Sequence, residues 1–141
     1  MNRRQEDIDR LLQLPQESDV WQFGLRQFHD WVYLACKAWQ PWMIAVFSVT
    51  HRAVVRSFPF HIDLPTEDFL WAMIVGAVRT PFPPLMPHRP TELQLQDDAI
   101  GHALKPWVER LGITCVLKGK MEAVEKALFE VGEEFYGPRG V

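Results

Sequence analysis

The sequence predicts an α/β (α+β) domain built on one mixed five-stranded sheet, with helices on both faces. Three observations predict it. Apolar and polar residues alternate with period two in several short segments, which is typical of strands. Apolar residues three and four positions apart mark helices in the second half of the chain. Short links join the first three predicted strands and helices separate the last two, which favours antiparallel pairs followed by parallel crossovers.

The chain divides into a short arm and a main domain. We expect residues 1–18 to form an N-terminal helical arm, in which the helix ends at Pro15. We expect residues 19–141 to form the domain itself. The first strand covers 20–28, where alternate residues face opposite sides of a sheet. An aromatic connection over 30–41 follows, and we expect a helical turn within it.

A hairpin follows the first strand. The continuous apolar run 43–49 is typical of a strand that is buried on both faces. A polar turn joins it to a third strand over 53–62, whose residues are β-branched and aromatic. Pro59 has no N–H to give to a neighbouring strand, so it places the third strand at an edge of the sheet.

The middle of the chain predicts a helix, a loop and a fourth strand. Thr66 precedes two acidic residues and an apolar run, which predicts a helix that Thr66 caps and that ends near Arg79. The stretch 80–90 holds five prolines and predicts a stiff, extended loop. The alternating segment 91–96 predicts the fourth strand.

Two more helices and one strand complete the prediction. Asp97 or Asp98 is expected to cap the next helix, and Pro106 inside its apolar stripe predicts a kink or a second helical segment. A short strand over 113–117 leads to a final helix that begins near Lys120. We expect this last helix to bury Met121, Val124, Leu128, Val131 and Phe135.

Composition limits the classes of function. A chain of 141 residues that is 48% hydrophobic fits one domain with its own core. The net charge of −3 and the pI of about 5.9 argue against a strong electrostatic surface for nucleic acid. The charged opening residues, and the lack of any apolar run near ~20 residues, predict no secretory signal and no membrane span. Cys36 and Cys115 lack zinc spacing and predict reduced thiols in a cytoplasmic protein.

The order of elements is similar to that of the ribonuclease H-like class, in particular the catalytic core of integrases and DDE transposases. Residues 20–22 resemble the opening strand of transposase cores, and residues 46–55 resemble their second hairpin. Residues 89–97 resemble the approach to their second aspartate, and residues 111–113 the entry to their last strand. The resemblance covers residues 19–131. The same pattern is also similar to a bacterial family of domains without an assigned activity.

The resemblance implies a chemistry that can be tested residue by residue. The class cleaves or joins phosphodiesters with two divalent ions held about 4 Å apart by clustered carboxylates. One acid belongs on the first strand, one at the end of the fourth and one on the final helix. The first-strand position is Gly24, and Asp19 and Asp30 lie too far along an extended chain to replace it. We therefore predict a non-catalytic domain that is not an enzyme and needs no metal or other cofactor.

One alternative keeps the metal chemistry. In it, the chain is a divalent-metal-dependent phosphodiesterase or nuclease with a rearranged site of Asp97, Asp98 and Glu122. Glu122 stands at the start of the final helix, where the third ligand belongs, whereas Glu133 lies ~16 Å further along the helix axis. The simpler interpretation is that the aspartates cap a helix and that the glutamates line a solvated helix face.

The aromatic residues of the second connection suggest an interaction surface. Trp31, Tyr33, Trp39 and Trp42 cluster there, and tryptophan is favoured where proteins bind one another. We predict a protein-interaction or structural module that contacts a second copy of the chain or another protein through these residues. The equal alternative is that the rings cover one end of the sheet.

A third hypothesis is a nucleic-acid-binding module without catalysis, which would use Arg26, Arg52 and Arg56. The acidic charge balance disfavours nucleic acid as a partner. The five histidines show no ligand spacing, so His51 is interpreted as a turn residue and His88 as a loop residue. No serine stands in a nucleophile elbow, and Cys36 has no base nearby in sequence.

Overall fold

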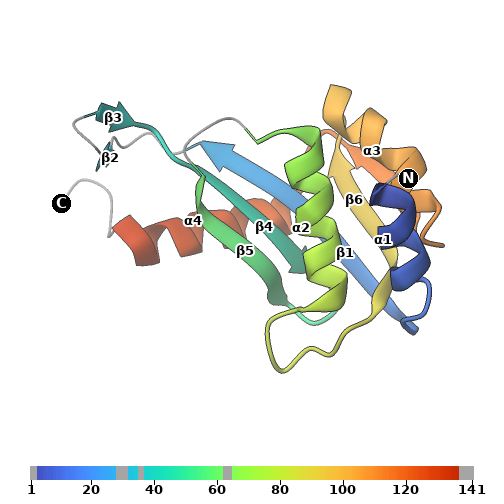
Figure 1. The fold of residues 1–141 in the computed structure, drawn as a ribbon. Coiled ribbons are helices and arrows are strands. Elements are labelled where there is room, and N and C mark those ends of the chain that lie inside the picture. Colours follow the sequence, from blue (N-terminus) through green and yellow to red (C-terminus); the bar gives the residue numbers. More distant parts are fainter. Residues whose placement is uncertain (1–2, 28–31, 35–36, 62–64, 137–141) are drawn as a thin grey trace.

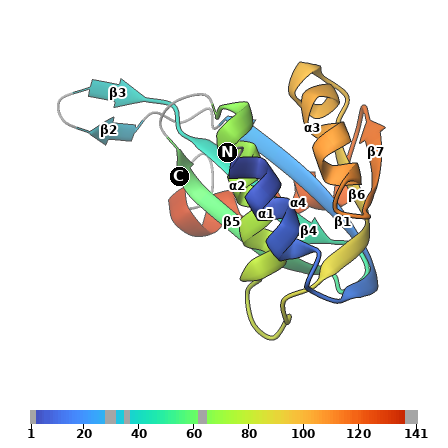
Figure 2. The same cartoon turned by 45° about the vertical axis from the view of Figure 1, so that its right-hand side comes forward.

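A five-stranded sheet forms the centre of the molecule, in a computed structural model that describes residues 3–27, 32–34, 37–61 and 65–136. Helices α1, α2 and α3 cover one face of the sheet, and α4 covers the other (Figures 1 and 2). In chain order the elements are α1 (Arg3–Leu11), β1 (Gln16–Gln27), β2 (Val32–Leu34), β3 (Lys37–Trp39), β4 (Trp42–Ser48), β5 (Ala53–His61), α2 (Glu67–Arg79), β6 (Arg89–Gln96), α3 (Ala99–Glu109), β7 (Thr114–Lys118) and α4 (Glu122–Tyr136).

The sheet has the mixed topology that the sequence predicts. Its strand order is β5-β4-β1-β6-β7, so β1 lies in the middle and β5 at an edge, as Pro59 predicts. Strands β1, β4 and β5 pair antiparallel, whereas β6 pairs parallel with β1 and β7 parallel with β6. In the register, Trp21 of β1 lies between Ser48 of β4 and Leu93 of β6.

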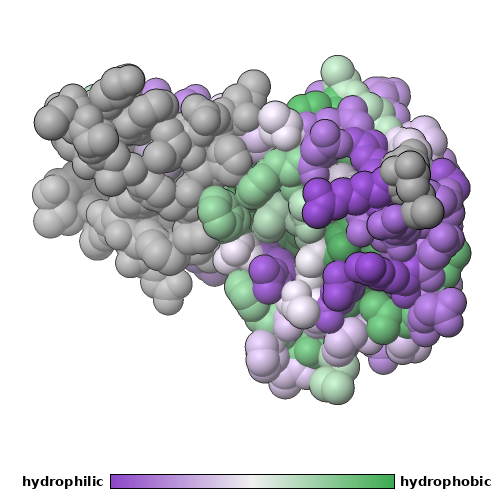
Figure 3. All heavy atoms as spheres, in the orientation of Figure 1, coloured by the Kyte–Doolittle hydropathy of each residue, from purple (hydrophilic) through white to green (hydrophobic). Residues whose placement is uncertain are grey.

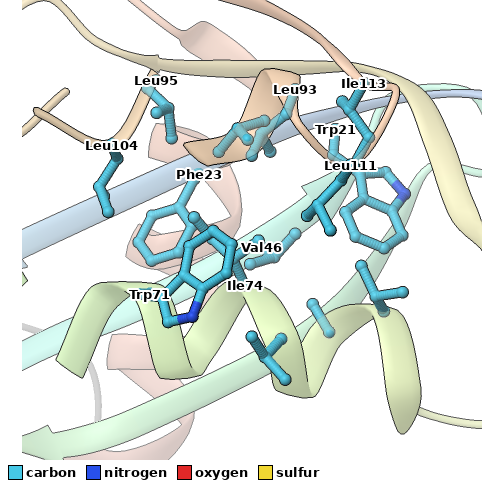
Figure 4. Packing of buried hydrophobic residues seen from close by; sticks show 14 of the residues in the cluster. Trp21, Phe23, Val46, Trp71, Ile74, Leu93, Leu95, Leu104, Leu111 and Ile113 are labelled. Atoms are coloured by element: carbon cyan, nitrogen blue, oxygen red, sulfur yellow. The ribbon is translucent and has the colours of Figure 1, made fainter. Parts of the chain in front are cut away.

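The larger core fills the face beneath α1, α2 and α3. Side chains of β1 and β6 meet those of α2 and α3 there, with Trp71 facing the strands (Figure 4). The labelled members are Trp21, Phe23, Val46, Trp71, Ile74, Leu93, Leu95, Leu104, Leu111 and Ile113. The first strand therefore buries its odd-numbered residues on this face, as its period-two pattern predicts.

A smaller core lies on the other face, beneath α4. Met43 and Ala45 of β4 pack there against Met121 and residues of α4, with Phe47 at the margin. The prediction that Met121, Val124 and Leu128 are buried is confirmed. The side chains of Val131 and Phe135 lie outside the described part of the structure.

The predicted arm is helix α1, and it packs on the main domain. Ile8 and Leu11 are buried in the larger core. The Arg4 guanidinium pairs with Glu67 at 2.7 Å, and the Trp71 indole N–H donates to Asp7 at 3.0 Å. Hydrophilic side chains gather over α1 on its outer side (Figure 3). The helix is thus amphipathic, and its apolar side contributes to the same core as the sheet.

The connection after β1 differs from its prediction. Instead of a helical turn, β2 and β3 pair antiparallel, with Val32 opposite Trp39 and Tyr33 opposite Ala38. This hairpin is a sheet separate from the main one, and it points away from the body of the molecule (Figures 1 and 2). β-branched and aromatic residues favour extended backbone, and here that preference prevails.

Both predicted helix caps are present. The Thr66 hydroxyl accepts from the Phe69 N–H at 3.1 Å at the start of α2, and the Asp98 carboxylate accepts from the Gly101 N–H at 2.7 Å at the start of α3. Helix α3 continues through Pro106 as one element, so the predicted second segment is wrong. Pro106 stands in the last turn, where the missing N–H removes a single hydrogen bond near the helix end.

Candidate functional site

The first-strand position is closed by helix α4. Gly24 is buried in β1, opposite Ala45 of β4. A Cβ atom at this position would lie 2.8 Å from Val124 Cγ1 and 3.2 Å from Leu128 Cδ1, which is closer than carbon atoms pack. The place where the resemblance implies a metal-binding aspartate is therefore filled by apolar side chains of α4.

Two glutamines lie beside Gly24 on the same face of the sheet. Gln22 of β1 and Gln94 of β6 are both buried, and the Gln22 Nε2 group donates to Gln94 Oε1 at 2.9 Å. The Val124 N–H at the start of α4 donates to Gln22 Oε1 at 2.9 Å, and Gln94 Nε2 donates to Glu92 at 2.6 Å. The first N–H groups of a helix lack partners within it, so Gln22 satisfies one of them from the sheet below. Neutral amides thus join β1, β6 and α4.

The acids of the alternative metal site have other partners. The Asp98 carboxylate caps α3, and Asp97 Oδ1 lies 2.8 Å from His102 Nε2. Glu122 Oε1 lies 3.8 Å from Lys120 Nζ. Among the residues that the structure describes, no three His, Cys, Asp or Glu side chains stand together as a metal ion would require. The Glu133 side chain lies outside that part.

A shallow hollow of about 530 Å³ opens beside the glutamine pair, at the start of α4. Its lining consists of Gln22, Lys118, Lys120, Glu122, Ala123 and Lys126. Three lysines against one glutamate give the rim a net charge of +2, and all four side chains are exposed. A site that binds a cation needs negative charge, whereas this rim is positively charged.

A second polar cluster lies on the opposite face of β1. Asp19 is only 1% exposed, and its carboxylate accepts from the Ser48 hydroxyl at 2.6 Å and the Trp21 indole N–H at 2.8 Å. His88 is also 1% exposed, with Nε2 at 2.8 Å from Asp19 Oδ2 and Nδ1 at 2.7 Å from the Met86 carbonyl oxygen. The cluster ties β1, β4 and the proline-rich loop together.

Sequence reasoning missed this cluster, although one signal was present. His88 is a loop residue, as predicted, and its ring is buried. Asp19 is odd-numbered, like Trp21 and Phe23, and alternate residues of a strand face the same side. The Asp19 side chain is therefore expected on the core face of β1. A carboxylate on that face needs a buried partner, because an unpaired buried charge costs several kcal/mol. The sequence did not reveal which residue that partner is.

The aromatic residues predicted to form an interaction surface fall in two places. Tyr33 lies on β2 and Trp39 on β3, the two strands of the projecting hairpin. Trp42 is half-buried at the start of β4, opposite Gln27 and His61. Trp31, like Cys36, lies outside the described residues.

The three arginines of the nucleic-acid hypothesis do not form one patch. The Arg26 guanidinium lies over the ring of Phe129 of α4, with 5.5 Å to the ring centroid. Arg56 lies over Phe82 at 5.5 Å and donates to the Thr80 carbonyl oxygen at 3.2 Å, on the side of α2. Arg26 and Arg56 therefore stack on opposite faces of the sheet, and Arg52 stands in the turn after β4.

Cys115 is a buried thiol of β7. Burial raises its pKa to about 11, so the thiol keeps its proton at neutral pH. Because the thiolate is the reactive form, this side chain is no nucleophile under ordinary conditions.

No protein-family model matches this chain, and no curated protein matches it. Within the described residues, no helix is both long enough and apolar enough to cross a bilayer. Any statement about function therefore rests on the residues and contacts above.

Proposed function

We propose that this chain is a non-catalytic ribonuclease H-like domain that acts through protein contacts. Two features of the fold support the assignment to this class. The central strand pairs antiparallel on one side and parallel on the other, and the two parallel crossovers run through helices. The final helix crosses the face that the class uses to assemble its ions, which here carries Gly24.

The contact of Gly24 with Val124 and Leu128 carries the non-catalytic part of the proposal. Two-metal chemistry requires carboxylates that converge on the ions. Here an apolar contact occupies the first-strand position, a neutral pair of amides stands beside it and lysines surround the rim. In the described structure, the side chains that touch the first-strand position belong to Val124 and Leu128, so none of them is a carboxylate that could hold Mg²⁺ or Mn²⁺ there.

Calorimetry tests this part directly. Titration of the protein with Mn²⁺ and with Mg²⁺ is expected to give no saturable heat, and the variant with Asp97→Asn and Glu122→Gln is expected to give the same trace. Saturable heat in the wild type that the double variant loses would establish the alternative phosphodiesterase site. The proposal would then fail.

The hairpin formed by β2 and β3 supports the interaction part. A two-stranded hairpin is at best marginally stable by itself in water. This one belongs to a separate sheet and stands away from the body of the molecule (Figure 2). It carries Tyr33 and Trp39, residue types that dominate the energetics of protein interfaces. We take a second copy of the chain as its partner.

Size-exclusion chromatography with light scattering tests the interaction. The wild type is expected to elute as a dimer at micromolar concentration, and Trp39→Ala is expected to shift it to a monomer. Leu12→Ser is the matched control, because Leu12 is an exposed apolar residue of another region, with 44% of its surface exposed. A wild type that stays monomeric, or a Trp39→Ala dimer of unchanged stability, would contradict the role of the hairpin.

A further inference from the structure

The imidazole ring of His88 faces a hydrogen-bond acceptor at each of its nitrogens. Nδ1 lies 2.7 Å from the Met86 carbonyl oxygen, which can only accept. Nε2 lies 2.8 Å from Asp19 Oδ2. A neutral imidazole has one N–H and one bare nitrogen. In either neutral tautomer, one nitrogen lone pair would therefore point at an oxygen lone pair within hydrogen-bond distance.

The other hydrogen-bond partners of the Asp19 carboxyl group are donors, which favours its ionised form. The Trp21 N–H can only donate, and it occupies the same Oδ2 atom that faces His88. The Ser48 hydroxyl donates to Oδ1, while its oxygen accepts from the His51 N–H at 3.0 Å. Besides His88, two donors thus bind the two oxygens, and donors of this kind stabilise a carboxylate. The proton between Asp19 and His88 consequently belongs to the ring.

The protonated ring connects the proline-rich loop to the central strand. Residues 80–88 run from α2 to β6 as the long connection seen in Figure 1. Met86 in this loop has 72% of its surface exposed, yet its carbonyl group is bonded to the buried ring. The ring also packs edge-on against Trp21, with 5.4 Å between centroids. The His88 ring thus ties the loop to β1, while the Phe82 N–H donates to the Val55 carbonyl oxygen of β5 at 2.7 Å and the His88 N–H donates to the Val78 carbonyl oxygen of α2 at 3.2 Å.

We propose that His88 is a proton-dependent latch: as an imidazolium it holds residues 82–88 against β1, and loss of its proton releases them. This inference is independent of the proposed interaction function. The charged and titratable side chains that face the ring in the described structure come from two elements. Glu17 of β1 has Oε2 at 3.2 Å from Nδ1, and His51 of the β4–β5 turn has Nε2 at 3.7 Å from Asp19 Oδ2.

The direction of the pH effect follows from the number of protons bound. The closed loop needs His88 protonated, because both ring nitrogens face acceptors, whereas an imidazole in water is largely neutral above about pH 6.5. The closed state therefore binds one proton more in this range. Raising the pH favours opening, by up to about ten-fold in the open-to-closed ratio for each pH unit.

Nitrogen-15 NMR of the histidine rings tests the protonation state in the wild type. At pH 7.5 we expect both His88 nitrogens to carry a proton, while the exposed His102 serves as the reference ring in the same spectrum. Asp19→Asn removes the charge that the imidazolium pairs with, so His88 is expected to be neutral in that variant at the same pH. A neutral His88 ring in the folded wild type at pH 7.5 would overturn the proposal.

Hydrogen exchange tests the release of the loop. Between pH 6.5 and 8.5, the protection of the Phe82, Leu85 and His88 amides is expected to fall up to about 100-fold in the wild type. His88→Gln keeps one donor toward Asp19 but has no group that titrates in this range. Once the pH dependence of intrinsic amide exchange is removed, the protection of the same three amides is therefore expected to stay constant in this variant. His51→Gln is expected to retain the wild-type profile. Identical pH profiles in the wild type and His88→Gln would refute the latch.

Discussion

The two faces of β1 satisfy their buried polar groups in different ways. On the α4 face, Gln22 and Gln94 are neutral and hydrogen-bond to each other and to the helix. On the opposite face, Asp19 and His88 form a buried charged pair that Trp21 and Ser48 complete. The comparison shows that the buried polar pair on the α4 face is neutral, whereas the buried acid on the opposite face is surrounded by hydrogen-bond donors.

The largest expected effect on stability comes from removing the Asp19 carboxylate from its buried cluster. Asp19→Ala leaves the imidazolium, an indole N–H and a hydroxyl buried without their acceptor. Loss of one partner of a buried pair costs about 3–5 kcal/mol, so urea unfolding is expected to show a decrease of that size in the free energy of unfolding. Glu130→Ala is the control, because this exposed acid of α4 lies outside the cluster and is expected to change stability by less than about 0.5 kcal/mol.

The next effect tests whether the α4 face is closed. Gly24→Ala forces a methyl group against Val124 and Leu128, and overpacking of this kind costs about 1–3 kcal/mol. Gly119→Ala is the matched control, because no atom lies within 4 Å of the added Cβ there. Thermal unfolding of both variants measures the difference. Equal melting temperatures would mean that α4 yields easily and that the first-strand position is open after all.

The hydrogen-bonded pair of Gln22 and Gln94 can be removed in two steps. Gln22→Leu leaves the Val124 N–H and Gln94 Oε1 without these partners and is expected to cost about 1–3 kcal/mol in urea unfolding. Replacing Gln94 by leucine as well removes both halves of the amide pair, so the double variant is expected to recover part of the loss. An additive loss in the double variant would show that the two amides do not act as a pair.

The smallest expected effect on stability concerns Asp98, one of the two aspartates of the alternative metal site. Asp98→Ala removes the cap of α3 and is expected to lower the free energy of unfolding by about 1 kcal/mol. The heat of Mn²⁺ titration is expected to be the same in this variant as in the wild type. Asp97→Ala, which removes an exposed acid, serves as the comparison for stability.

Local patterns in the sequence predicted most of the fold. The strand periodicity, the caps at Thr66 and Asp98 and the edge position that Pro59 indicates all depend on residues close in sequence, and the structure confirms them. The hairpin of β2 and β3 was missed because aromatic residues at that density fit a turn, a strand or a short helix. For Pro106 the sequence left a kink and a second segment open, and the structure has one helix through it, in which Leu104 and Val108 are buried in the core.

The candidate sites depend on contacts that no local pattern contains. His88 meets Asp19 across 69 positions, and the Val124 N–H meets Gln22 across 102. The absent side chain of Gly24 was visible in the sequence, but the two side chains that fill its place come from the last helix. Period-two parity would have placed Asp19 on the core face, although it would not have identified His88 as the partner.

The position of β1 also determines how this chain can fold. Its antiparallel partner follows soon after it, whereas Gln22 meets Gln94 of its parallel partner 72 positions later. Closing so long a loop is entropically costly, so nearby pairs form sooner than distant ones. During synthesis on the ribosome, β1 therefore emerges before both of its neighbours in the sheet, and its edge toward β6 stays unpaired until residues 89–96 have followed.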